Sequence, residues 1–61
     1  MLDPMKVTEY ANALYRTHGD AAEVEAAQRE RQHTDAGEPD QAADWRRIRA
    51  AIRERRGALQ S

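Results

Sequence analysis

Two histidines and several carboxylates are the first side chains to test for chemistry. Neither His18 nor His33 has a second histidine three or four residues away, which is the spacing that holds zinc on a helix. Glu30 and His33 have the Glu-x-x-His spacing of di-iron helical bundles, but such a site also needs glutamates on facing helices. We therefore expect no metal site and no cofactor.

The usual groups of an enzyme active site are missing from this sequence. General acid–base chemistry needs two carboxyl groups in a cleft that separates their pKa values, and 61 residues enclose little interior. There is no cysteine, the single serine is Ser61, and the three glycines are isolated from one another. The sequence therefore lacks an activated nucleophile and a glycine-rich phosphate loop. We expect a protein that is not an enzyme and has no small-molecule substrate.

Arginines near the carboxyl end are the stronger candidates for a function. Residues 1–44 carry ten acidic and four basic side chains, whereas residues 45–61 carry six arginines and one glutamate, so the charges of the two parts are −6 and +5. On a helix, four of the six arginines fall within about 100° of Trp45, beside its apolar side. The predicted interaction residues are Arg46, Arg49, Arg53 and Arg56, together with Tyr15 at the border of an upstream apolar face.

Four interpretations of this basic segment stay open. It can pair with the protein's own acidic part, which is the interpretation that we favour, or it can dock on an acidic protein partner. Binding of nucleic acid is less favoured, because Arg47 and Arg55 lie away from the other four arginines instead of gathering on one exposed side. Peripheral membrane binding is less favoured still, since acidic side chains are spread through the rest of the chain.

The element that must position the arginines is a helix predicted over residues 39–56. Ile48 and Ile52 fall within about 60° of Trp45 on a helical projection, which makes one continuous apolar side. A proline opens this range, as is common in a first helical turn, and Gly57 is predicted to end it.

Two further helices are predicted upstream, over residues 4–18 and 21–35. The first has apolar residues at helical spacing, and the second is rich in alanine, which favours helix and permits close approach of a neighbour. Gly19 is predicted to separate them, with Asp20 and Glu23 as a capping box at the start of the second helix. One long helix running through Gly19 is the alternative.

The predicted fold is all-α, in a single domain of residues 1–61. It is a small antiparallel helical hairpin, with a tryptophan–isoleucine ridge against an alanine-rich helix, and a third helix at the N-terminus. The alternative is a long N-terminal helix plus one shorter helix. In outline the hairpin resembles one tetratricopeptide unit, which implies an interaction module, although no second repeat follows. The side chains predicted to build the core are Val7, Tyr10, Leu14, Val24, Trp45, Ile48 and Ile52.

A core of this size is thin for a self-contained monomer, so we expect a protein partner or self-association, for example as a homodimer. The first residues lack the regions of a signal peptide, and no apolar run approaches the roughly 20 residues that span a bilayer. We therefore expect a cytoplasmic protein, and its arginine and alanine content is compatible with a GC-rich bacterial gene. The predicted function is a small accessory or regulatory protein that docks on a partner. A nucleic-acid-binding regulator that uses the arginine-rich C-terminal helix is the alternative.

Overall fold

The computed structural model describes residues 2–60, with the backbone alone described for residues 59 and 60. The chain forms three α-helices in this range and a single turn of 3₁₀-helix. They are α1 (Pro4–His18), η1 (Gly19–Ala21), α2 (Ala22–Asp35) and α3 (Pro39–Gln60). No strand occurs among the residues described, so the prediction of an all-α fold is confirmed.

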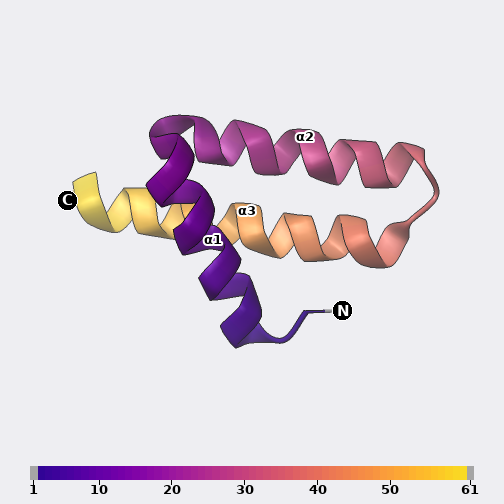
Figure 1. The fold of residues 1–61 in the computed structure, drawn as a ribbon, viewed down its shortest axis with the longest axis horizontal. Helices are drawn as coiled ribbons and strands as arrows, with labels where there is room; N and C mark the ends of the chain where they lie inside the picture. The colour runs from indigo at the N-terminus through magenta and orange to yellow at the C-terminus, as the bar shows by residue number, and fades with distance from the viewer. Residues whose placement is uncertain (1, 61) are drawn as a thin grey trace.

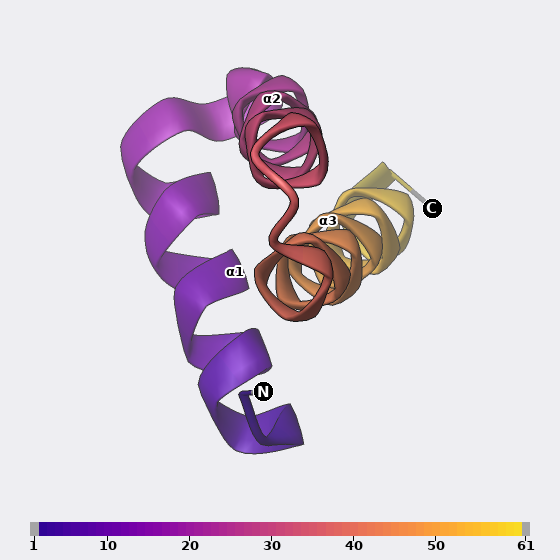
Figure 2. The same cartoon turned by 90° about the vertical axis from the view of Figure 1, so that its right-hand side faces the viewer.

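The helices α2 and α3 form an antiparallel hairpin, and α1 lies across one side of it (Figures 1 and 2). No loop separates α1, η1 and α2, so the chain from Pro4 to Asp35 is one helical segment with a sharp bend at η1 (Figure 1). The predicted hairpin with a third helix is therefore present. The alternative of a long N-terminal helix is partly right, because helical structure continues through the bend.

The backbone at Gly19 explains the bend. Its φ of +59° lies in the region that favours glycine, and its N–H donates to the carbonyl oxygen of Tyr15, which ends α1. The capping box predicted for Asp20 and Glu23 does not form, because Ala21 is the N-cap residue of α2 and no side chain caps that position. Asp20 lies inside the tight 3₁₀ turn, one residue before the N-cap position of α2.

Two other helix ends are satisfied by nearby residues. The Asp3 carboxylate accepts a hydrogen bond from the Lys6 N–H at 2.9 Å, which caps α1. A Schellman motif ends α2 at Gly37, where φ is +73° and the Glu38 N–H donates to the His33 carbonyl oxygen at 2.8 Å. This short turn sends the chain straight back into α3 and makes the two helices antiparallel.

Gly57 does not end the last helix, contrary to the prediction, and α3 continues to Gln60. The φ of Gly57 is not positive, and a β-carbon placed there would meet nothing within 4 Å. A glycine costs about 1 kcal/mol inside a helix, but it ends one only where the chain adopts the left-handed conformation. The arginines before Gly57 therefore lie within the helix and not in its last turn.

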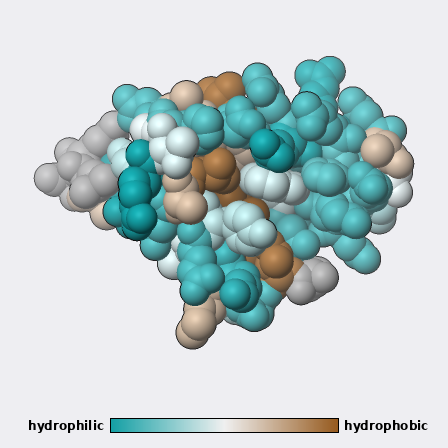
Figure 3. Space-filling model, viewed as in Figure 1, coloured by the Kyte–Doolittle hydropathy of each residue, from teal (hydrophilic) through white to brown (hydrophobic). Residues whose placement is uncertain are grey.

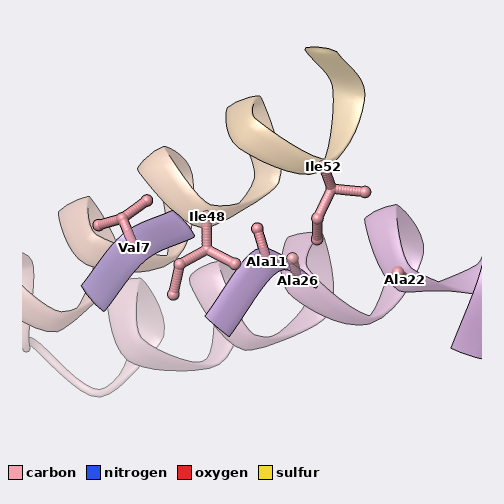
Figure 4. Close-up of a cluster of buried hydrophobic side chains, with 6 residues drawn as sticks. All are labelled: Val7, Ala11, Ala22, Ala26, Ile48 and Ile52. Atoms are coloured by element: carbon pink, nitrogen blue, oxygen red, sulfur yellow. The ribbon is translucent and has the colours of Figure 1, made fainter. Parts of the chain in front are cut away.

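The core is a row of small side chains on α1 and α2 that receives two isoleucines from α3. Ile48 and Ile52 are the largest fully buried side chains of the part of the chain described, and they point toward α1 and α2 (Figure 4). The rest of the buried cluster consists of Val7, Ala11, Ala22 and Ala26. Alanine lets α2 lie close to α3, so the predicted packing of isoleucines on an alanine-rich helix is confirmed.

Trp45 and Leu14, which were also predicted for the core, are partly buried and pack against this cluster. The guanidinium carbon of Arg29 lies 5.2 Å from the centroid of the Trp45 ring, a cation–π contact between α2 and α3. The tryptophan therefore seals the edge of the core and does not fill its centre.

Tyr10 and Val24 are not core residues, and the prediction is wrong for both. Their side chains are 48% and 57% exposed. The buried side of α2 is the one with Ala22 and Ala26, which lies about 160° to 200° around the helix from Val24. On α1 the buried side of the helix is the one that carries Ala11, and it lies about 100° around the helix axis from Tyr10.

Gly19 and Gly57 should respond in opposite directions to replacement by alanine. At Gly19 the positive φ strains any residue with a β-carbon, so Gly19→Ala is expected to lower the free energy of unfolding by about 1–3 kcal/mol. At Gly57 the helix favours alanine, and Gly57→Ala should raise that free energy by up to about 1 kcal/mol. Urea denaturation followed by circular dichroism measures both. A shift of the same sign at both positions would contradict the placement of these glycines.

Candidate functional site

On one side the α2–α3 hairpin is covered by α1, and the opposite side is left uncovered, as Figure 2 shows end-on. Along the groove between α2 and α3, two shallow hollows lie next to each other and share Arg49. All of their lining residues come from α2 and α3. We call this surface the open face, and it is defined by the residues that line the two hollows: Glu23, Val24, Ala27, Gln28, Glu30 and Arg31 of α2 with Arg46, Arg49, Ala50, Arg53 and Glu54 of α3.

Glu30 links the two helices within the open face. Its carboxylate accepts from Nε of Arg46 at 3.3 Å and from Nη1 of Arg49 at 3.4 Å. The Glu30 side chain is 17% exposed, whereas those of Arg46 and Arg49 are 69% and 44% exposed. One carboxylate is therefore shared by two largely solvated guanidinium groups, through long and weak contacts.

The open face carries a local surplus of positive charge. Arg53 and Arg31 are exposed, and neither forms an ion pair with any other side chain that the structure describes. Glu54 is the second carboxylate at the edge of the cationic hollow. Four arginines thus meet the three carboxylates of Glu23, Glu30 and Glu54, and Glu23 also lies near Arg56, on a chain whose net charge is −1.

Arg56 is balanced separately, because it reaches back to the start of α2. Its Nη1 lies 3.8 Å from Oε2 of Glu23, and its Nε lies 3.7 Å from Oδ1 of Asp20. Glu23 Oε1 and Arg56 Nε are buried without a hydrogen-bond partner in the described part of the chain, so this pair is held by charge and not by a good hydrogen bond. Basic side chains of α3 therefore meet acidic side chains that precede them in sequence.

Tyr15 belongs to α1 and is not brought together with the predicted interaction arginines of the open face. It is partly buried and packs against the core cluster, and the guanidinium carbon of Arg55 lies 5.6 Å from the centroid of its ring. Arg55 also donates from Nη1 to Oδ1 of Asn12 at 2.7 Å. These contacts hold α1 on α3 and leave little of Tyr15 free as an exposed anchor.

The α1 side of the molecule has a small apolar surface of its own. The Leu2 N–H donates to Oδ1 of Asp44 at 3.0 Å, which ties the start of the chain to α3. Beside this bond, Leu2, Tyr10, Trp45 and Ile48 contribute to a shallow hollow. In Figure 3 the apolar surface on this face is a narrow, interrupted brown band among polar side chains. The sequence did not predict the hydrogen bond between Leu2 and Asp44, because 42 positions separate the two residues.

Histidine and carboxylate side chains do not converge on a metal site within the described residues, where no group of three or more could hold an ion. Glu30 faces the arginines of α3, while Nδ1 of His33 pairs with Oε1 of Glu38 at 2.8 Å. The two members of the Glu-x-x-His spacing therefore have different partners. The His33 contact instead links the end of α2 to the residue before α3.

No family model, curated protein or solved structure matches this chain. The resemblance to a tetratricopeptide unit thus rests on the arrangement of two helices alone. Among the residues described, no helix combines the length and the apolar character that crossing a membrane requires. The open face is interpreted below from its own geometry and charge.

Removing the negative charge of Glu30 should change stability little. Its two arginine partners are largely exposed, so water and salt screen the ion pairs, and Glu30→Gln is expected to lower the free energy of unfolding by about 1 kcal/mol or less. Urea denaturation at low and high salt measures the loss, which salt should reduce. Glu54→Gln, an exposed carboxylate on the same face, is the matched control. A loss of several kcal/mol would mean that Glu30 is part of the structural core.

Proposed function

We propose that this protein is a small, non-enzymatic accessory or regulatory factor of the cytoplasm that docks its open face on a partner protein. The observation that supports the proposal is that α1 covers only one side of the α2–α3 hairpin (Figure 2). Packing by α1 occupies one side, while the other side presents arginines and an exposed valine. Arginine is enriched at protein interfaces, and exposed apolar side chains gain free energy when a partner covers them.

The composition of the core supports the same proposal. The buried apolar residues of the described chain are two isoleucines, one valine and four alanines. Because full burial of a large apolar side chain contributes about 1.5–3 kcal/mol, this set stabilises the fold only modestly. A partner that binds the folded chain alone would stabilise it further by mass action.

A photo-crosslinking amino acid at position 50 tests docking directly. Ala50 is exposed on the open face, and Ala13, exposed on α1, is the matched control position. In cells that express the full chain, we expect irradiation to give discrete protein adducts from position 50 that position 13 does not give. Equal adducts from both positions, or no protein adduct from position 50, would contradict the proposal.

A nucleic-acid-binding regulator is the second candidate, because Arg46, Arg49 and Arg53 are exposed along one side of α3. It predicts that a labelled duplex or single strand binds the full chain at low salt, with an affinity that falls steeply as salt rises. The adducts from position 50 would then be sensitive to nuclease. Absence of binding at low salt removes this candidate.

Docking on a second copy of the chain is distinguished from docking on another protein by its dependence on concentration. A homodimer gives a melting temperature that rises with protein concentration. Sedimentation as a monomer at all concentrations would leave a different protein as the partner.

A further inference from the structure

We infer that the partner segment for the open face is an acidic amphipathic helix, seated in the groove between α2 and α3 on the side away from α1. This inference rests on the proposed docking function and specifies the chemistry of the partner. A helix that binds in a groove presents anchor residues at spacings of three and four. The two sides of the open face differ in chemistry, and together they specify what those anchors are.

The α2 side of the open face presents two apolar side chains among the charged and polar residues Glu23, Gln28 and Arg31. Val24 is 57% exposed, and Ala27 lies three residues further along α2 and lines the same hollow. Small side chains allow a helix axis to come within the roughly 8–10 Å that is typical of helix packing. In the core the chain already uses alanine in this way, since Ala22 and Ala26 receive the isoleucines of α3. A partner helix can therefore lay leucine or valine against Val24 and Ala27.

The α3 side of the open face is cationic. Arg46, Arg49 and Arg53 follow one another at spacings of three and four and line one hollow. Two of them share the single carboxylate of Glu30 at 3.3 and 3.4 Å, so their capacity to donate hydrogen bonds is mostly unused. Arginine binds carboxylates through directional, charge-assisted hydrogen bonds. Glutamates at spacings of three and four on a partner helix match this row.

Acidic and apolar groups on the same face favour a peptide over a nucleic acid. Glu30 and Glu54 line the cationic hollow, so the arginines are interrupted by carboxylates and do not form the continuous basic track that a phosphate backbone requires. Single strands bind largely by stacking bases on aromatic rings. The three aromatic side chains of the sequence lie on α1 or toward it, so the open face has no ring for stacking: they are Tyr10, Tyr15 and Trp45.

Fluorescence anisotropy with labelled synthetic peptides and the purified full chain tests the inference. The probe is a helical peptide of about 18 residues, or five turns, with one stripe of leucine and an adjacent stripe of glutamate on an alanine background. One comparison peptide has glutamine in place of glutamate, and another has the same composition in an order that abolishes both stripes. We expect the acidic peptide to bind at least about tenfold more tightly than either comparison peptide.

Matched charge reversals locate the binding surface on the chain. Arg53→Glu alters the open face, and Arg16→Glu makes the same change at an exposed position of α1. We expect the first to weaken binding of the acidic peptide at least about tenfold and the second less than about twofold. Val24→Gln, which removes the apolar side chain without changing charge, should also weaken binding. Circular dichroism checks that each variant keeps its helical content.

Several outcomes would overturn the inference. They are equal binding of the reordered peptide, no binding of any peptide, equal effects of the two charge reversals, and tighter binding of a DNA strand than of the acidic peptide. Its failure is distinguishable from failure of the proposed function. Protein adducts from position 50 without peptide binding would remove the acidic helix as partner and keep docking.

Discussion

Ile52→Ala is expected to lower the free energy of unfolding by about 2–5 kcal/mol, a large part of the total stability of a small domain. The Ile52 side chain is fully buried, and only Ile48 equals it in size among the fully buried side chains described. Truncation removes its apolar contacts and leaves a cavity that the surrounding alanines are too short to fill. Because the rest of the cluster is valine and alanine, no neighbour can replace it.

Urea denaturation followed by circular dichroism measures this loss. Val24→Ala is the matched control, since it also truncates a β-branched residue in a helix, but at an exposed position. We expect the control to change the free energy of unfolding by no more than about 0.5 kcal/mol. Similar losses for the two variants would contradict the assignment of Ile52 to the core and Val24 to the surface.

The buried side of α3 could be predicted because the sequence spacing determines it. Ile48 and Ile52 are bulky, they are four residues apart, and every other side of the helix is charged or small. The buried side of α2 could not be predicted in the same way. That helix has alanines on more than one side, and the side that packs is the one whose alanines, Ala22 and Ala26, let α3 approach most closely.

The three glycines show why a helix end is only partly a local property. Gly19 and Gly37 both adopt positive φ, and Gly37 is followed within two residues by Pro39, which cannot continue the preceding helix. After Gly57 come alanine, leucine and glutamine, which all favour helix. The helix therefore continues through Gly57, and the prediction that it ends there is wrong.

The open face was also predictable in part. Helical spacing places Arg46, Arg49 and Arg53 near one another, which the structure bears out in a single hollow. Their acidic partner could not be chosen from the sequence, because Glu30 is 16 and 19 residues from Arg46 and Arg49. Which carboxylate of α2 faces which arginine depends on the register of the hairpin, and that register is set by packing and by the turn at Gly37.

Ala26→Leu is expected to lower the free energy of unfolding by about 1–3 kcal/mol, even though leucine is more apolar and forms helix well. Ala26 is fully buried and lies in the same cluster as Ile52 (Figure 4). The added carbon atoms have no space between α2 and α3, so the helices must separate or the side chains must leave their preferred rotamers. Ala13→Leu, at an exposed position of α1, is the control and should change stability by no more than about 0.5 kcal/mol.

Combining Ala26→Leu with Ile52→Ala tests the same contact more sharply. The new leucine can occupy the space that the isoleucine leaves, so the double variant should be more stable than the sum of the two single losses by about 0.5–3 kcal/mol. Additive losses would mean that residues 26 and 52 do not share one packing site, and that the register of α2 on α3 differs from the one described. Because the same register places Glu30 opposite Arg46 and Arg49, that result would also remove the geometric basis of the open face.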